Sequence, residues 1–116
     1  MSKPELEFHA PSGPWEKPPG SAPGIRERTL AADADGAHRT ALVRWAPGTD
    51  TSASGVAVHE HWEEVYVLDG DLHDLTLGET FAKDTYACRP PGMPHGPWTS
   101  DAGVTMLVVT YPDPAV

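Results

Sequence analysis

Histidine and glutamate side chains gather in one short stretch of the chain. His59 and His61 are separated by a single residue, and Glu63 and Glu64 follow them closely. On an extended strand, residues 59, 61 and 63 point to the same face. Two imidazoles and one carboxylate on a shared face are typical of half a binding site for a borderline divalent metal ion. The alternative interpretation is the polar end of a solvent-exposed strand.

A histidine in a loop rich in proline and glycine is a further candidate ligand. His95 lies in the segment 89–97, which reads Arg-Pro-Pro-Gly-Met-Pro-His-Gly-Pro. Proline and glycine restrict this backbone by sterics rather than by packing. A ligand that is held rigidly loses little entropy when it binds a metal. The alternative is a structural turn in which His95 is incidental.

The elements that must position these side chains are short strands. From Ile25 onward the hydrophobic pattern alternates with a period of two, and glycine and proline supply many turns. The pair Asp69-Gly70 predicts a hairpin. Eight or so strands with regular turns favour a sandwich or barrel, most simply a jelly roll. The expected strands are 25–31, 38–46, 56–61, 64–68, 71–77, 80–83, 85–89 and 104–111.

Two separated sequence patterns resemble the motifs of the cupin superfamily. Glu63 is followed by six residues and then Gly70, as at the end of the first cupin motif. Pro90, Gly92 and His95 match the Pro-x-Gly-x2-His core of the second motif. The two patterns occur in the expected order and at a plausible separation, so the resemblance is specific.

The resemblance covers about residues 38–111 and carries implications for the fold and the site. It implies an all-β jelly-roll β-barrel, the cupin double-stranded β-helix. It also implies one divalent transition metal per chain, with Fe2+ favoured and Zn2+, Ni2+ or Mn2+ as alternatives. The expected metal ligands are His59, His61, Glu63 and His95.

The register of the first motif stays open at this point. If His59 and His61 form the histidine pair, the distance to Glu63 is short, and a two-residue turn would place Glu64 opposite His61 instead. If His59 is the second histidine of the pair, Ala57 replaces the first one and His61 lies in the turn. Glu64 is therefore the substitute for Glu63 in the ligand set.

A metal held by imidazoles and one carboxylate keeps open coordination positions, which catalysis requires. We therefore expect an enzyme that acts on a small organic substrate, most simply a non-haem dioxygenase. The alternatives are a Lewis-acid cyclase, isomerase or lyase, and a non-catalytic metal or ligand sensor such as the cupin modules of anti-sigma factors. Arg89 either anchors an anionic substrate or pairs with a surface acid. The sequence assigns no further catalytic residue.

Composition excludes several classes of partner. The 116 residues carry a net charge of −9, which argues against nucleic-acid binding and against anionic membranes. No apolar run approaches the roughly 18 residues of a membrane span. The first residues lack the apolar stretch of a secretory signal, so we expect a cytoplasmic protein.

The first 24 residues differ from the expected barrel domain at 25–116. Six of the thirteen prolines lie in this segment, which predicts an extended N-terminal arm. Trp15 is a large apolar side chain in this otherwise polar arm, so we expect it to dock on its own barrel or on a neighbouring subunit. Because strand edges are normally covered or paired, we expect a homodimer in which the arm braces the shared face.

Overall fold

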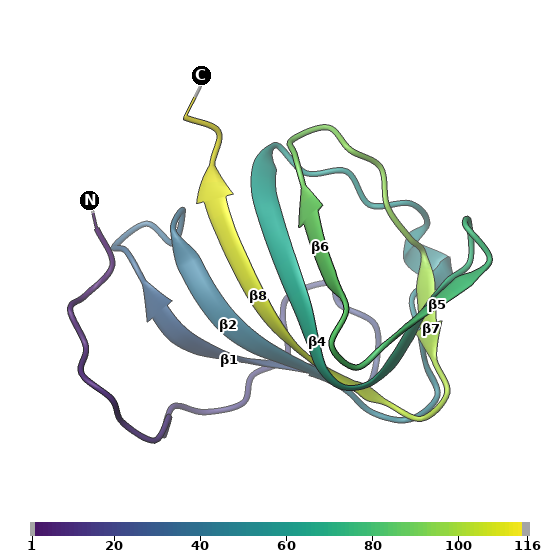
Figure 1. Ribbon diagram of the computed structural model, residues 1–116, viewed down its shortest axis with the longest axis horizontal. Helices are drawn as coiled ribbons and strands as arrows, with labels where there is room; N and C mark the ends of the chain where they lie inside the picture. The colour runs from purple at the N-terminus through teal and green to yellow at the C-terminus, as the bar shows by residue number, and fades with distance from the viewer. Residues whose placement is uncertain (1, 115–116) are drawn as a thin grey trace.

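The computed structural model describes residues 2–114 and contains eight strands within them (Figure 1). Strands dominate, and the one helical element in the described part of the chain is the three-residue 3-10 helix η1, Ser52–Ser54. The all-β jelly-roll prediction is confirmed. The strands are β1 Ile25–Ala32, β2 Arg39–Trp45, β3 Thr49–Asp50, β4 His61–Asp74, β5 Glu79–Ala82, β6 Tyr86–Arg89, β7 Trp98–Ser100 and β8 Val104–Pro112.

Strand β4 belongs to both walls of the barrel. Its first half pairs with β8 and β6, and its second half pairs with β5 and β7. The path of paired strands runs β1-β2-β8-β4-β7-β3, and β5 and β6 attach to β4. Figure 1 shows the result, a strongly curled sheet with β1, β2, β8, β4 and β6 on one side and β5 and β7 on the other.

The bend of β4 lies where a hairpin was expected, and the hairpin prediction at Asp69-Gly70 is wrong. The pairing with β8 continues through both residues, with a register shift between Val67 and Asp69. Gly70 has a φ of 79°, and a Cβ there would lie 2.0 Å from the carbonyl oxygen of Gly103. A left-handed glycine suits a bulge as well as a turn, so its presence could not distinguish the two.

The turn that follows β4 lies at residues 75–78, between β4 and β5. The Asp74 carboxylate accepts hydrogen bonds from the backbone N–H groups of Thr76 and Leu77, each at 2.9 Å. The Gly78 N–H donates to the Asp74 carbonyl at 2.9 Å. An aspartate at the start of a tight turn closed by glycine is a common arrangement, because its side chain satisfies backbone donors that the turn leaves free.

The predicted strand at 56–61 is also wrong over most of its length. Residues 55–60 form a loop, in which Ala57 alone makes a β-bridge, and β4 begins at His61. The alternation of apolar and polar residues is present, but within residues 2–114 no strand pairs with residues 55–60 beyond the single bridge at Ala57. The short strands β3 and β7 were not predicted, because two or three residues are too few to show a period.

The core fills the space between the two walls. Its buried members share an inward position on strands β1, β2, β4 and β8, and partly buried side chains such as Trp98 pack against them. Trp45 and Trp98 meet edge to face, with ring centroids 6.3 Å apart. The buried cluster consists of Ile25, Trp45, Val65, Val67, Leu72, Val104 and Met106.

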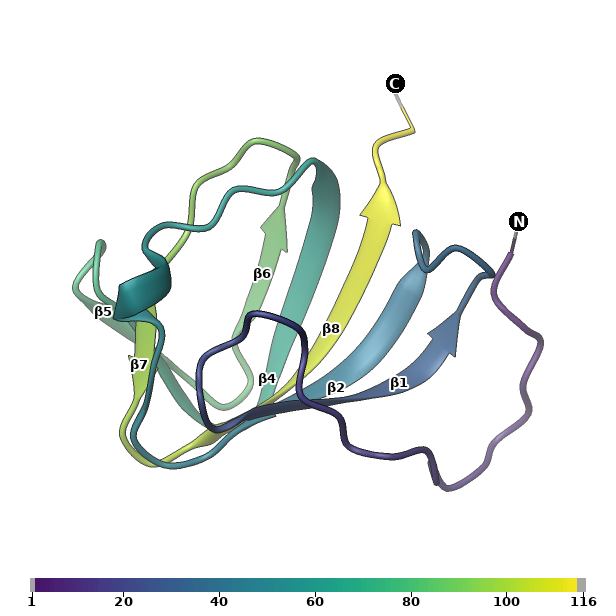
Figure 2. The ribbon, with the colours of Figure 1, turned by 180° about the vertical axis from the view of Figure 1, so that it is seen from behind.

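Residues 2–24 contain no helix, and their one β-type contact is an isolated bridge between Glu16 and Glu27. Seen from behind, the segment runs outside β1 and then forms a wide loop before it enters β1 (Figure 2). The guanidinium groups of Arg28 and Arg44 both lie over the Trp15 ring, with their Cζ atoms 4.8 Å and 4.2 Å from its centroid. Trp15 therefore docks on its own barrel.

The expectations about assembly and location remain predictions. Docking of Trp15 within one chain leaves open whether two chains associate, which light scattering at micromolar concentration would determine. Within residues 2–114, no helix is long and apolar enough to cross a bilayer.

We predict that Gly70→Ala destabilises the fold much more than Gly78→Ala. Both glycines have positive φ, but a Cβ at Gly78 meets nothing within 4 Å. Gly78→Ala should lower the free energy of unfolding by about 1–2 kcal/mol through backbone strain. Gly70→Ala should cost at least about 2 kcal/mol more, because of the overlap with backbone atoms. Urea denaturation measures both values, and equal losses would contradict the role of the bend.

We also predict that Trp15→Ala lowers the free energy of unfolding by about 1–3 kcal/mol, since it removes two cation–π contacts and buried ring surface. Phe8→Ala is the matched control, because Phe8 is an aromatic residue of the same segment with a relative exposure of 101%. The control should change stability by less than about 0.5 kcal/mol. Similar losses for the two variants would show that Trp15 does not anchor the segment.

Candidate metal centre

The four expected ligands come from three pieces of the chain and meet at one end of the barrel. His59 lies in the loop before β4, His61 is the first residue of β4, and Glu63 follows on the same face of that strand. His95 lies in the proline-rich loop between β6 and β7. Val65 and Val67 continue the face of Glu63 into the core, so the site stands directly above the packed interior.

Backbone hydrogen bonds join the two loops that carry the histidines. The Ala57 N–H donates to the His95 carbonyl at 2.8 Å, and the His95 N–H donates back to the Ala57 carbonyl at 2.9 Å. The Gly92 N–H donates to the His59 carbonyl at 2.8 Å. These three bonds hold the loops against each other, and this contact brings His95 to the histidines of the first segment.

The side-chain donors converge closely enough to share one ion. The candidate ligand atoms of His59, His61 and Glu63 all lie within 4.8 Å of one another. The Nε2 atom of His59 is 3.6 Å from Oε2 of Glu63, and Nε2 of His95 is 3.9 Å from Oε1 of Glu63. The ring centroids of His59 and His95 are 4.8 Å apart. Glu63 is thus the carboxylate at the middle of the cluster.

His95 presents an unshared lone pair to this cluster. Its Nδ1 lies 3.0 Å from the Met93 carbonyl oxygen, which can only accept, so Nδ1 carries the hydrogen and Nε2 is the acceptor. The side chain is 5% exposed, and Nε2 has no hydrogen-bond partner among the described residues. A buried polar atom without a partner is costly, and a metal ion would satisfy it.

The surroundings favour the neutral form of two of the imidazoles. Burial lowers the pKa of His95 below its ordinary value, and the positive charge of Arg89 lowers it further. Burial also lowers the pKa of His61, and His59 adds to this effect. Neutral imidazole is the form that binds a metal, so both side chains are in the required state at neutral pH.

Arg89, at the end of β6, pairs with a residue of the cluster. Its guanidinium donates to Oε1 of Glu63 at 3.0 Å, and its Cζ lies 5.2 Å from the ring centroid of Trp98. The sequence predicted that Arg89 either anchors an anionic substrate or pairs with a surface acid. The acid with which it pairs is Glu63, a member of the cluster. This bond orients the carboxylate, so that Oε2 faces Nε2 of His59 while Oε1 lies between Arg89 and His95.

The structure distinguishes between the two glutamates. Strand β4 runs without a turn through Glu63 and Glu64, so the two side chains point to opposite faces. Glu64 accepts hydrogen bonds from the hydroxyl groups of Tyr86 and Tyr111. Two partners on the other face hold Glu64 away from the histidines, and His61 begins the strand instead of lying in a two-residue turn.

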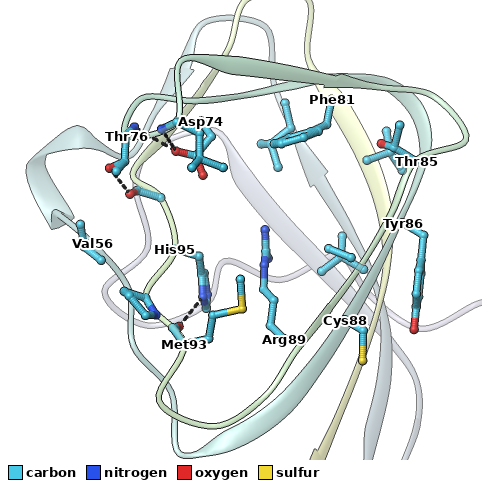
Figure 3. A pocket seen from close by; sticks show the side chains of 17 residues that line it. Val56, Asp74, Thr76, Phe81, Thr85, Tyr86, Cys88, Arg89, Met93 and His95 are labelled. Atoms are coloured by element: carbon cyan, nitrogen blue, oxygen red, sulfur yellow. Dashed lines mark hydrogen bonds between the residues drawn. The ribbon is translucent and has the colours of Figure 1, made fainter.

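A cavity of about 460 Å3 opens beside the cluster. His95 and Arg89 line it and also approach Glu63, so they connect the cavity to the candidate ligands. Figure 3 shows the Arg89 side chain reaching into this cavity next to the His95 ring. A smaller hollow of about 280 Å3 touches His61 from another direction.

Sequence reasoning missed part of the cavity wall. Asp74 is 3% exposed and lines the cavity, as do Leu72 and Phe81 from β4 and β5. The period of two in the strands indicated an inward face for such residues. It could not show which inward residues fill the core and which border the cavity, because that depends on how the second wall folds over.

A jelly roll with histidines and one glutamate converging on its inner face defines a cupin. The model of the ChrR cupin-like domain family matches residues 7–113 of the chain. The chain therefore belongs to the ChrR cupin-like family, within the cupin superfamily. The match begins inside the proline-rich segment and includes Trp15.

Solved structures share the fold at low identity. An RmlC-like cupin from Shewanella frigidimarina is 18% identical, with a TM-score of 0.74 over 98% of this chain and 96% of the other. The polyketide cyclase RemF from Streptomyces resistomycificus is 22% identical, with a TM-score of 0.72 over 91% and 78%. An acetylacetone dioxygenase from Acinetobacter johnsonii is 15% identical, with a TM-score of 0.67 over 96% and 80%. Comparison with curated protein sequences gives no significant match.

We predict that Glu63→Gln weakens metal binding at least about tenfold, because the amide loses the charge that attracts the ion. Glu64→Gln is the matched control on the adjacent residue and should keep the wild-type metal content. Titration calorimetry with Zn2+ and metal analysis of the purified variants measure this difference. A larger loss for Glu64→Gln would restore the alternative register.

Proposed function

We propose that this protein is a metal-dependent cupin enzyme that acts on a small organic substrate, most simply a non-haem iron dioxygenase. The observation that carries the proposal is the convergence of the candidate ligand atoms of His59, His61 and Glu63 within 4.8 Å of one another, beside a cavity that His95 and Arg89 line. His95 completes the proposed ligand set, and its Nε2 atom is buried without a partner among the residues described.

The donor set fits a divalent transition metal. Three imidazoles and one carboxylate suit iron, zinc, nickel or manganese, and the chemistry of the ligands does not by itself choose among them. Four protein ligands leave positions free on a metal that accepts six, and free positions are a requirement for catalysis. A bound iron(II) ion would supply the capacity for dioxygen chemistry.

The protein groups around the ion would control its surroundings. The Met93 carbonyl keeps the hydrogen of His95 on Nδ1, so that Nε2 faces the cluster. Arg89 holds one oxygen of Glu63 and leaves the other available. The apolar wall that includes Val65 and Val67 excludes water from the side of the cavity where a substrate would bind.

The second candidate is Lewis-acid chemistry, in which zinc, nickel or manganese would polarise a substrate carbonyl. It is supported by the cavity, whose polar groups are few, and by the polyketide cyclase among the proteins of similar fold. The two candidates share every ligand and differ in the ion and in the need for dioxygen.

The proposal is tested with wild-type protein and His95→Ala, loaded separately with Fe2+ and Zn2+. We expect about one metal ion per wild-type chain, and a thermal midpoint that falls by several degrees when the metal is removed, because an ion that binds the native state stabilises it by mass action. His95→Ala should lose most of the metal and this dependence. Equal metal content in the two proteins would exclude the proposed site.

Oxygen consumption then separates the two candidate reactions. Acetylacetone, the substrate named for the dioxygenase of similar fold, is the first compound to test, together with other small diketones. Iron-dependent oxygen uptake that His95→Ala abolishes would support the dioxygenase. Conversion by the zinc-loaded protein without oxygen uptake would support the Lewis-acid enzyme, and metal binding without any conversion would favour the sensing role.

A further inference from the structure

We propose that Arg89 is the anion-binding group of the cavity, and that the ligand is a small monocarboxylate with an apolar body. This inference rests on the proposed function, because it assigns a substrate class to the same site. It depends on the position of Arg89, on the charge of the surrounding groups and on the character of the cavity wall.

Arg89 has donors to spare at the cavity. Its side chain is 12% exposed, and within residues 2–114 its one ion-pair partner is Glu63, reached through a single guanidinium nitrogen. The other two guanidinium nitrogens have no hydrogen bond to a described residue, yet they are not among the buried atoms without partners, so they are accessible. Figure 3 shows the side chain pointing into the cavity, beside His95. Free, accessible donors of a guanidinium match the two oxygens of a carboxylate.

The charges around the cavity favour a single negative charge on the ligand. The charged groups that line it are Arg89 and Asp74, and Arg89 is paired with Glu63 at 3.0 Å. The Asp74 carboxylate is already engaged by the backbone of Thr76 and Leu77, on the wall of the turn. A divalent ion together with Arg89, Asp74 and Glu63 gives an excess of one positive charge. A monoanion would neutralise it.

The rest of the wall is suited to a hydrocarbon body. Val65, Val67, Leu72 and Phe81 line the interior of the cavity. A volume near 460 Å3 lies within the range of about 300–1,000 Å3 typical of small-ligand sites. A ligand with its carboxylate on Arg89 would therefore place its carbon chain against these side chains.

The rim of the cavity is apolar as well. Val56, Leu77 and Met93 line the cavity and keep relative exposures of 50%, 63% and 43%. They come from three different loops, so apolar side chains surround the opening on several sides. Clusters of exposed apolar side chains around an opening are typical of sites that bind apolar ligands. The carbon chain can thus extend to the rim without meeting a charge.

The experiment uses hexanoate and hexanamide as probes, since they share a carbon chain and differ in charge. Each is titrated into zinc-loaded and into metal-free protein, and binding is followed by calorimetry and by the NMR resonance of the Arg89 Nε–H. We expect hexanoate to bind wild-type protein about tenfold or more tightly than hexanamide, as a charge-assisted hydrogen bond predicts. The Arg89 resonance should shift with hexanoate alone.

Arg89→Gln tests the assignment, because glutamine can still donate to Glu63 but carries no charge. This variant should lose the preference for hexanoate and bind hexanamide as wild type does. Arg39→Gln is the matched control: Arg39 is also a partly buried arginine, paired with Glu27 at 2.8 Å, and it does not line the cavity. The control should keep the full preference.

The outcomes separate the inference from the proposed function. A preference for hexanoate that survives in Arg89→Gln, or its absence in wild type, overturns the role of Arg89, whatever metal is bound. Failure of wild type to bind zinc overturns the proposed metal centre instead, whereas zinc-loaded wild type that shows no preference for hexanoate overturns the role of Arg89 alone. If Arg89→Gln does not fold, Arg89→Lys, which keeps the charge, and the wild-type Arg89 resonance decide it.

Discussion

The bend of β4 at Gly70 is the constraint on which the rest of the molecule depends. The backbone of Gly70 lies so close to the Gly103 carbonyl that no side chain fits between them. Because β4 bends there without ending, one strand pairs with β8 and β6 in one wall and with β5 and β7 in the other. The two walls are thereby covalently continuous, and the cavity between them begins at the inner face of this strand.

The candidate metal centre is built from the same strand at its other end. His61 and Glu63 stand on rigid backbone, whereas His59 and His95 lie in loops that hydrogen-bond to each other through Ala57 and Gly92. Glu63 interacts with His59, His95 and Arg89, so it is the electrostatic centre of the group. The Glu63 carboxylate and the unpartnered Nε2 atom of His95 present acceptor atoms to the same space, which is why the cluster suits a cation.

Much of the fold could be predicted from the sequence, because alternation and turn residues act locally. The strands β1, β2, β5, β6 and β8 lie within a few residues of their predicted positions. The errors occurred where local signals are shared by different structures. Asp69-Gly70 suits a hairpin or a bulge, and 56–61 alternates like a strand but pairs only at Ala57 before β4 begins at His61. For the site, the sequence predicted four ligands, and their role in metal binding stays a prediction, while the choice between Glu63 and Glu64 depended on which face of β4 turns inward.

The sequence by itself determined the all-β class, the cupin motifs and the residue types of the candidate site. These depend on steric preferences and spacings that are written along the chain. Only the tertiary structure decided that β4 continues through Gly70, that Arg89 pairs with Glu63, and that Glu64 turns away toward Tyr86 and Tyr111. Each of these outcomes depends on contacts between atoms from distant parts of the chain. These contacts form only when the two walls of the barrel come together, so no local pattern in the sequence reports them.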